Sequence, residues 1–595
     1  MKRPSIKIIA ITLLCIALAF SFWFSSAWLQ LCYGLALFLF GMQCIEDGLH
    51  NAAGGTLEKL MKRSTSTPIK GLLFGIGATF VLQSTTLVSL LTIALLSTGL
   101  IKLAGGIAII LGTNLGATSG IWLLALAGQS ISLSPIAVPM LVFGILASFF
   151  NDKTKAIGRV LIGISLIFLG IDAIKVGFQE IGNRVDFANM QVNGFTEIVI
   201  FSVIGLILTL LLQSTHATLI LTLAALSGGQ ISVMQGFAIA IGSNVGSSIT
   251  TALVGILGGN RNGQRLALAH LLFNAVTASL SLILWWPLSR LVIQLAAFTG
   301  MNNLLQLALF HTLFNVLGLI VFWPQQKRLA KQLKHWLPKK QPQIETLPTN
   351  SQAVLPQYLN DNVLYANDTA IRAMFQEIRR LNQLSLEVIC HALFVPVEQL
   401  HQYRPQQTLS APAKPLELNV QSLYEWQIKP LYSDILAFGS KINVGDDVYR
   451  EQLNNAYYVA FRMIEIIKHS KHLQKNMQHF LSEENSPMAQ AYLNLRQHLL
   501  VSLYQFHSIM EQPTDEITQQ KTETAFTRHI ATLAEQKEKV LQQLRDGDFN
   551  GWQTVSLLND MHYAHIINEG LNDIVQNHSN ELCQIKDDDE HFQAA

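Results

Sequence analysis

Long apolar segments fill the first 325 residues of this chain. They lie near residues 6–28, 30–46, 72–98, 104–127, 134–150, 157–174, 197–227, 234–257, 266–295 and 304–323. A backbone inside lipid must satisfy its own hydrogen bonds, which only helices and closed barrels achieve. Because these segments lack the alternation of barrel strands, we predict an all-α protein that begins with a polytopic bundle of membrane helices.

Charge divides the chain into two unlike halves. Residues 1–340 hold 22 Lys+Arg and 8 Asp+Glu, and the totals of 41 and 39 leave 19 and 31 for residues 341–595, so the halves carry +14 and −12. No Asp or Glu occurs between Glu197 and Glu345. The overall charge of +2 therefore hides a membrane half and an acidic, water-soluble half.

The N-terminus and the cysteines limit the class of protein further. Met1-Lys2-Arg3 and the apolar run that ends at Phe24 imitate a signal peptide. The run can span about 30 Å of hydrocarbon, so we expect a retained first helix, with a cleaved signal peptide as the alternative. The five cysteines form no CxxC pair, which argues against zinc ribbons and disulfide scaffolds; they are Cys15, Cys32, Cys44, Cys390 and Cys583.

A basic cluster follows the last apolar segment and predicts the topology. By the positive-inside rule this cluster is cytoplasmic, as is everything after it. We predict a membrane domain at residues 1–335 in the bacterial inner (plasma) membrane, a proline-rich linker at 336–359 and a cytoplasmic helical domain at 360–595. The cluster comprises Lys327, Arg328, Lys331, Lys334, Lys339 and Lys340.

The cytoplasmic half has the apolar spacing of amphipathic helices. We predict six antiparallel helices that form one or two bundles. They span about residues 362–393, 417–443, 447–476, 486–511, 524–545 and 549–580.

Two motifs recur in register within the membrane half. Gln83-Ser84-Thr85 returns as Gln213-Ser214-Thr215, and the Gly-x-Asn-x-Gly motif around Asn114 returns around Asn244. Both offsets are 130 residues, and the upstream helix repeats at an offset of 129. We predict a duplicated unit, with repeats at about 30–130 and 160–260.

Each Gln-Ser-Thr motif interrupts an apolar run whose halves are too short to span a bilayer. The interruption predicts a re-entrant hairpin, and transporters join such breaks from two repeats near the midplane. Free helix N-termini suit an anion, while hydroxyl and carbonyl oxygens suit sodium. The acid-free stretch argues against an acid-based proton relay there.

These motifs resemble the sodium/phosphate cotransporter family, which carries a Gln-Ser-Ser-Ser type motif in each of two inverted repeats, followed by Gly-x-Asn-x-Gly. The resemblance covers about residues 30–325 and implies sodium-coupled phosphate transport by alternating access. It implies a substrate and ion site formed by Gln83, Ser84, Thr85, Thr86, Gln213, Ser214 and Thr215, with Asn114 and Asn244 as further ligands and sodium as coupling ion without another cofactor.

Departures from the family pattern concern histidine. His216 stands at the fourth position of the second motif, where a hydroxyl is usual, and either hydrogen-bonds phosphate or serves packing. His270 and His311 each precede an Asn by four residues, so both members of each pair share a helix face. Hydrogen bonding between helices is their expected role.

The cytoplasmic domain is similar in size, helix count and position to PhoU-like domains, pairs of three-helix bundles linked to phosphate regulation. His565 stands where their metal-binding motifs have an acid, which argues against a resident metal. No nucleotide or nucleophile motif appears, so we expect neither an enzyme nor a nucleic-acid binder. The alternatives are a membrane-bound phosphate sensor and a carrier of another oxyanion. Homo-oligomers and phosphate-regulatory partners stay open.

Overall fold

The computed structural model describes residues 6–53, 60–61, 64–65, 67–127, 133–182, 194–258, 261–338, 353–402, 419–442, 447–483, 486–511 and 516–593. It divides into two compact units, Met1–Lys339 and Lys340–Ala595. The described residues form helices joined by turns and short loops, without strands, as predicted. Residues 339–352, which make up most of the predicted linker, and the two lysines that end the predicted basic cluster lie outside the described residues.

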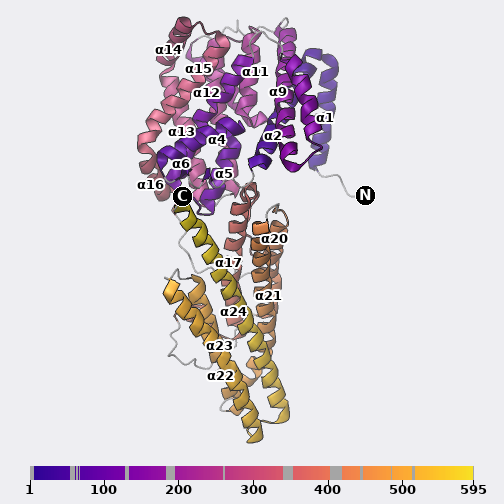
Figure 1. Ribbon diagram of the computed structural model, residues 1–595, viewed down its shortest axis with the longest axis vertical. Coiled ribbons are helices and arrows are strands. Elements are labelled where there is room, and N and C mark those ends of the chain that lie inside the picture. Colours follow the sequence, from indigo (N-terminus) through magenta and orange to yellow (C-terminus); the bar gives the residue numbers. More distant parts are fainter. Residues whose placement is uncertain are drawn as a thin grey trace. The chain divides into compact units, whose positions relative to one another are not determined.

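The first unit consists of apolar helices (Figure 1). Their bounds are α1 Ile6–Phe24, α2 Ser26–Ala53, α4 Pro68–Leu82, α5 Thr85–Ser97, α6 Leu103–Gly116, α7 Thr118–Ala127, α8 Ser134–Ala147, α9 Asp152–Gly182, α10 Phe195–Leu212, α11 Thr215–Ser227, α12 Val233–Gly258, α13 Arg261–Ile283, α14 Trp285–Thr299, α15 Asn303–Phe322 and α16 Gln326–Trp336.

Seven described stretches are long and apolar enough to cross a membrane. They are Ser26–Leu49, Leu103–Leu126, Lys153–Glu180, Phe195–Leu212, Val233–Ile256, Arg261–Ile283 and Asn303–Trp336. The remaining apolar helices are shorter. The chain is therefore a membrane protein that crosses the bilayer several times.

Two predicted segments are each split into two helices. Residues 104–127 form α6 and α7, which meet at Ala117, and residues 266–295 form α13 and α14, which meet at Leu284. Pro287 follows the second break and has no N–H to donate, so an uninterrupted helix would lose a backbone bond there. The prediction of single helices was wrong at both places.

Helices α2 and α9 pack closely and run antiparallel through their glycines. A Cβ atom on Gly34 would lie 2.7 Å from the Gly170 oxygen, and one on Gly41 would lie 2.7 Å from the Gly163 oxygen. Adding 129 to the first partner and subtracting it from the second converts one pair into the other (34 to 163, 170 to 41). The two helices therefore make the same contacts when they are exchanged.

Helix pairs α4/α6 and α10/α12 repeat one packing arrangement. A Cβ on Gly116 would lie 2.6 Å from the Ile76 oxygen, and one on Gly246 would lie 2.8 Å from the Leu206 oxygen. Both partners are shifted by 130 residues, which is the offset of the sequence motifs. Small residues permit this close backbone approach between helices in lipid.

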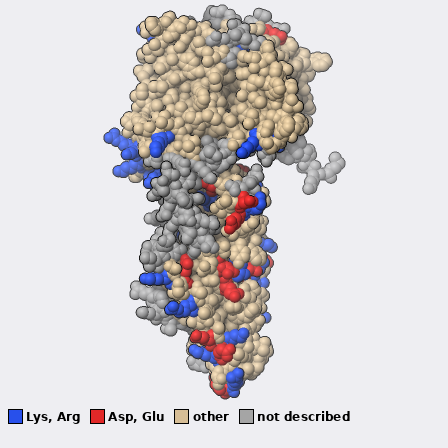
Figure 2. All heavy atoms as spheres, viewed as in Figure 1, with Lys and Arg blue, Asp and Glu red and all other residues tan. Residues whose placement is uncertain are grey.

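Charged groups are sparse on the surface of the first unit and gather at one edge, where lysines and arginines cluster (Figure 2). Helix α16 holds part of this cluster and buries Leu329, Ala330 and Leu333 on its opposite face. Nearby, the guanidinium of Arg265 donates to the Leu337 oxygen at 2.6 and 2.9 Å. The basic edge is thus attached to the bundle by packing and by a charge-assisted hydrogen bond.

The second unit is built from long amphipathic helices that agree with the six predicted. They are α17 Asn367–Ala392, α18 Val397–Gln402, α19 Val420–Leu423, α20 Lys429–Gly439, α21 Asp447–Leu481, α22 Pro487–Glu511, α23 Glu516–Arg545 and α24 Gly551–Gln593. A π-helical turn, Tyr424–Ile428, joins α19 to α20. Helix α21 packs against both α17 and α24, and α24 packs against α22 and α23.

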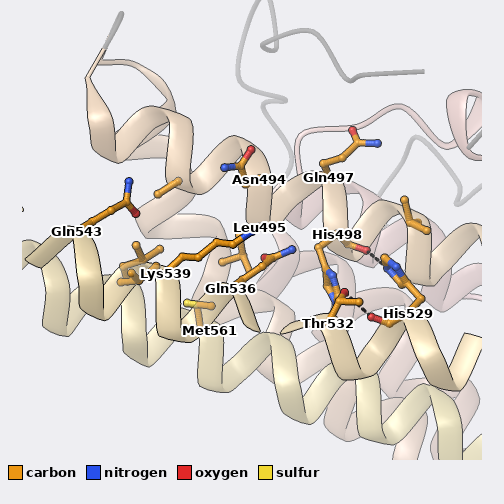
Figure 3. Close-up of a pocket in the computed structure, with 14 residues that line it drawn as sticks. Asn494, Leu495, Gln497, His498, His529, Thr532, Gln536, Lys539, Gln543 and Met561 are labelled. Carbon is orange, nitrogen blue, oxygen red and sulfur yellow. Dashed lines mark hydrogen bonds between the residues drawn. The ribbon is translucent and has the colours of Figure 1, made fainter. Parts of the chain in front are cut away.

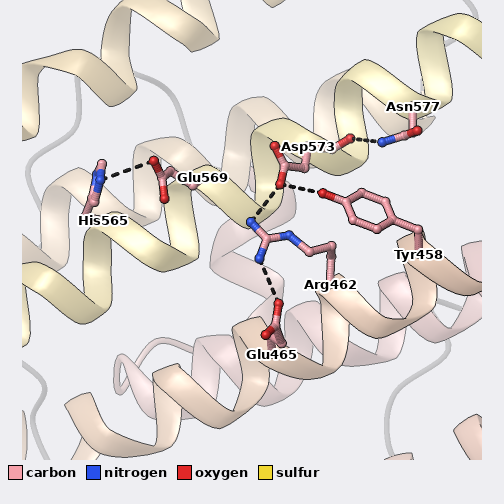
Figure 4. Close-up of polar contacts among 7 residues, drawn as sticks. All are labelled: Tyr458, Arg462, Glu465, His565, Glu569, Asp573 and Asn577. Atoms are coloured by element: carbon pink, nitrogen blue, oxygen red, sulfur yellow. Dashed lines mark hydrogen bonds and ion pairs between the residues drawn. The ribbon is translucent and has the colours of Figure 1, made fainter.

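A polar network joins α21 to α24 in this unit (Figure 4). Arg462 binds both Glu465 and Asp573 at 2.7 Å, and Tyr458 donates to Asp573 at 2.9 Å. Because the guanidinium neutralises both carboxylates, they pair two helices rather than stand open. His565, where an acid was expected from the resemblance, faces Glu569 at 3.3 Å on its own helix.

A cavity of about 450 Å³ opens between α22, α23 and α24 (Figure 3). Its wall combines carboxamides, among them Asn494 and Gln536, with the ammonium group of Lys539. At one end the rings of His498 and His529 stack at 4.3 Å. Burial lowers the pKa of His498 to about 3, so this ring is neutral in the folded unit at ordinary pH.

Candidate functional site

The first motif forms a sharp break between two short helices. Gln83 ends α4 in the left-handed region, with φ of 51°, and Ser84 then caps α5 by accepting from the Leu87 N–H at 3.2 Å. Gln83, Ser84, Thr85 and Thr86 are partly exposed. Because the first amides of a helix have no acceptor within it, α5 begins with free donors at this break.

The second motif repeats the break almost atom for atom. Gln213 has φ of 52°, and the Ser214 hydroxyl accepts from the Ala217 N–H at 3.2 Å. Thr209 and Thr218, on opposite sides of the break, share a hydrogen bond of 2.8 Å. The chain therefore folds back on itself between α10 and α11.

The two motifs differ in their surroundings. Thr215 and His216 are buried, whereas Gln213 is exposed. Among the described residues, no hydrogen bond joins Gln213 to another predicted site residue. The structure thus assembles the second motif around its hydroxyl and imidazole groups rather than around its glutamine.

Side chains from both motifs meet at Gly120 on α7. A Cβ atom on Gly120 would lie 2.6 Å from Gln83 Oε1 and would overlap His216 Nε2. Gln83 Nε2 donates to the Phe80 oxygen at 2.5 Å and lies 3.5 Å from Ser119 Oγ. The ring of His216 is hydrogen-bonded to the backbone of Ala117. A glycine here leaves room for both side chains.

The paired asparagines are buried and have different partners. Asn114 donates to the Ile110 oxygen at 2.9 Å within its own helix. Asn244 donates to the Ala240 oxygen at 3.4 Å and also lies 2.8 Å from His311 Nε2 on α15. Asn244 thus links the second motif's neighbourhood to α15, while Asn114 has no printed counterpart of that link within the described chain.

This arrangement supplies the chemistry of an ion-binding site. Two helix N-termini present N–H groups and positive dipole ends, which favour an anion. Hydroxyl and carbonyl oxygens at the same breaks suit a hard cation. Neither kind of group is common inside an apolar bundle unless it serves packing or a ligand.

Residues 37–176 match the model of the Na+/Pi-cotransporter family. The chain is a relative of that family. It is 26% identical to "Uncharacterized protein YqeW" of Bacillus subtilis, over 51% of this chain and 97% of that protein. It is 24% identical to "Putative inorganic phosphate export protein YjbB" of Salmonella typhimurium, over 59% of this chain and 62% of that protein.

The same protein name occurs for a relative in Escherichia coli, 25% identical over 53% of this chain and 57% of the relative. The chain thus matches somewhat more than half the length of these export-named relatives. No solved structure matches it significantly.

Sequence reasoning did not find several residues of this cotransporter-like site. Gly120 and Ser119 follow directly on the first Gly-x-Asn-x-Gly motif, so their position was the available signal. Glu46 on α2 is hydrogen-bonded to the side chain of Ser84, which only tertiary structure brings near. His311 was expected to bond between helices, and its partner proves to be the predicted site residue Asn244.

Proposed function

We propose that this protein is a secondary transporter that moves inorganic phosphate together with sodium. The observation that carries the proposal is the pair of matched helix breaks, at Gln83 and Gln213, whose following helices bring Gln83 and His216 together at Gly120. The membrane bundle, the family match and the phosphate named for its relatives agree with this function.

Alternating access of two inverted repeats is the proposed mechanism. The exchangeable antiparallel contacts of α2 and α9 are those expected of two helices related by a twofold axis in the membrane plane. The α4/α6 and α10/α12 pairs then belong to opposite repeats. Each break is a re-entrant hairpin in this proposal, because α4, α5 and α11 are too short to span the bilayer.

The predicted site residues have distinct roles in the proposed mechanism. The free amides that begin α5 and α11 bind phosphate oxygens. The hydroxyl groups of Ser84, Thr85 and Ser214 and nearby carbonyl oxygens bind sodium. Sodium charge then offsets part of the anion's charge during its passage. The combined gradients determine whether phosphate enters or leaves the cell.

The second unit is proposed to be a cytoplasmic, PhoU-like regulator of the transporter in the inner membrane. Its helices pack as two groups joined along α21 and α24, which agrees with paired three-helix bundles. The lysine and arginine edge of the first unit supports a cytoplasmic C-terminus through the positive-inside rule.

Phosphate flux in proteoliposomes tests this proposal. The purified full-length protein is reconstituted, labelled phosphate is added, and a sodium gradient is imposed in either direction, with potassium replacing sodium as control. Sodium-dependent phosphate movement is expected. Movement of phosphate without sodium would refute the coupling, and preference for sulfate or arsenate would identify a different oxyanion. Phosphate binding without any flux would favour a membrane sensor.

Gln83→Ala and Gln213→Ala test the site itself. Both variants are expected to lose sodium-dependent flux while they remain in the membrane in normal amount. Normal flux in both would refute the assignment of the two motifs as the site.

A further inference from the structure

Buried polar atoms without a protein partner lie beside the candidate site. His311 Nδ1, Asn315 Oδ1 and His216 Nε2 are all buried and make no hydrogen bond within the described structure. His311 is 1% exposed and His216 is 6% exposed. Leaving such atoms unpaired costs about 1–3 kcal/mol each. A ligand that pairs with them would remove this cost.

The hydrogen bonds around His311 determine its tautomer. Its Nε2 lies 2.8 Å from Asn244 Nδ2 and 3.3 Å from Asn315 Nδ2. Both amide orientations are fixed independently, because Asn244 Nδ2 also points at the Ala240 oxygen and Asn315 Nδ2 at the His311 oxygen, and carbonyls only accept. Two donors face Nε2, so Nε2 accepts and the ring proton lies on Nδ1.

His216 has the opposite polarity. Its ring is hydrogen-bonded to the backbone of Ala117, whose N–H already donates to the Thr113 oxygen. The remaining backbone group is the Ala117 carbonyl, so the bonded ring nitrogen carries the proton. Nε2, which has no partner, is therefore an acceptor.

The donor and the acceptor belong to one region of the bundle. His216 and His311 lie within electrostatic range of each other. Trp122 Nε1 on α7 donates to Thr312 Oγ1, next to His311, at 2.9 Å, which holds α7 against α15. Gly120, which His216 Nε2 touches, stands two residues before that tryptophan.

We propose that the two histidines select a protonated tetrahedral oxyanion: His311 Nδ1–H donates to an anionic oxygen, and His216 Nε2 accepts from a P–OH group. This inference rests on the proposed function and names the form of its substrate. Hydrogen phosphate, dihydrogen phosphate and hydrogen arsenate have both an anionic oxygen and a hydroxyl at neutral pH. Sulfate has no hydroxyl, so it leaves His216 Nε2 unpaired, and unpaired site groups give strong discrimination.

Amide replacements at the two positions test the proposal, because each amide reproduces one ring nitrogen. Asn places its amide near the position of Nδ1, and Gln places its amide near the position of Nε2. At position 311, His311→Asn is expected to keep the donor and most phosphate affinity, whereas His311→Gln loses it. At position 216 the order is reversed: His216→Gln keeps the acceptor, and His216→Asn loses it.

Phosphate affinity is measured by equilibrium binding of inorganic phosphate to the purified full-length variants, with sulfate as competitor. We expect the two losing variants to bind phosphate about 10-fold to 100-fold more weakly. His216→Asn should also lose a similar factor in discrimination against sulfate. Sodium-driven flux is measured in parallel, and monodisperse elution in detergent confirms that each variant is folded.

The outcomes distinguish this inference from the proposed function. Normal phosphate binding in all four variants, or equal losses whichever amide is introduced, would overturn the histidine assignment even if flux is intact. Wild-type binding with the expected crossed pattern but without flux would support the histidines and refute transport. Unchanged discrimination against sulfate in His216→Asn would refute the acceptor role.

Discussion

Gln83 and His216 lie against the same glycine, Gly120, although they come from different motifs. We predict that Gly120→Ala abolishes phosphate transport, because the added Cβ would overlap His216 Nε2 and lie 2.6 Å from Gln83 Oε1. Gly120 is helical, so alanine itself favours the local backbone. Flux in proteoliposomes measures the loss.

Gly77→Ala is the matched control for this substitution. Gly77 is also a helical glycine, on α4, but a Cβ there meets nothing within 4 Å. The control should transport normally and be slightly more stable. Equal flux in the two variants would show that the space at Gly120 has no functional role.

A second prediction concerns the backbone strain at Gln83. Its φ of 51° is in the left-handed region, which costs a non-glycine residue about 1–2 kcal/mol. Gln83→Gly should therefore unfold at a higher temperature than Gln83→Ala, while both fail to transport. Thermal unfolding in detergent and flux assays separate the two effects. Transport by the glycine variant would mean that the turn, and not the glutamine side chain, is what function requires.

The repeat made much of this site predictable. Gln83 and Gln213 interrupt long apolar runs with polar groups that an unbroken membrane helix would leave unpaired, and both are helix ends in the structure. The long helices α21, α22 and α24 were predictable because their apolar spacing continues over many turns. These features depend on local sequence, which a reader can inspect directly.

The meeting of distant residues was not predictable. Gly120 follows a recognisable motif, but its proximity to His216 depends on how α7 packs against α11. The bond between Asn244 and His311 depends in the same way on α12 packing against α15. A single sequence contains no measure of these distances, so the site was found only in part.

A third prediction is that two buried groups of the second unit respond to pH in opposite directions. Burial raises the pKa of Asp560 to about 6, although Tyr492 donates to it at 2.6 Å. The folded state therefore holds this proton more tightly, and stability falls as pH rises from about 4 to about 6. Burial lowers the pKa of His498 to about 3, so its contribution is lost as pH falls below about 6.5.

Variants separate the two effects. On going from pH 7 to pH 5, Asp560→Asn should lose about 2 kcal/mol around α22 and α24, because only His498 then titrates. His498→Gln, which keeps an acceptor for Asn568, should gain about 1 kcal/mol over the same interval. Hydrogen exchange of α22 and α24 peptides, corrected for intrinsic rates, measures both. The same pH response in both variants would contradict these pKa shifts.

The final prediction concerns the division of labour between the two units. The chain separates into compact units at Lys339 and Lys340, and the candidate site lies wholly in the first. A chain cut near residue 345 should therefore still move phosphate with sodium, but with a changed maximal rate or a changed response to internal phosphate, because the proposed regulator is missing. Flux at several internal phosphate concentrations measures this difference. A truncated protein that is monodisperse and binds phosphate but moves none would show that the second unit takes part in transport itself. Flux identical to that of the full chain at every concentration would remove the regulatory role.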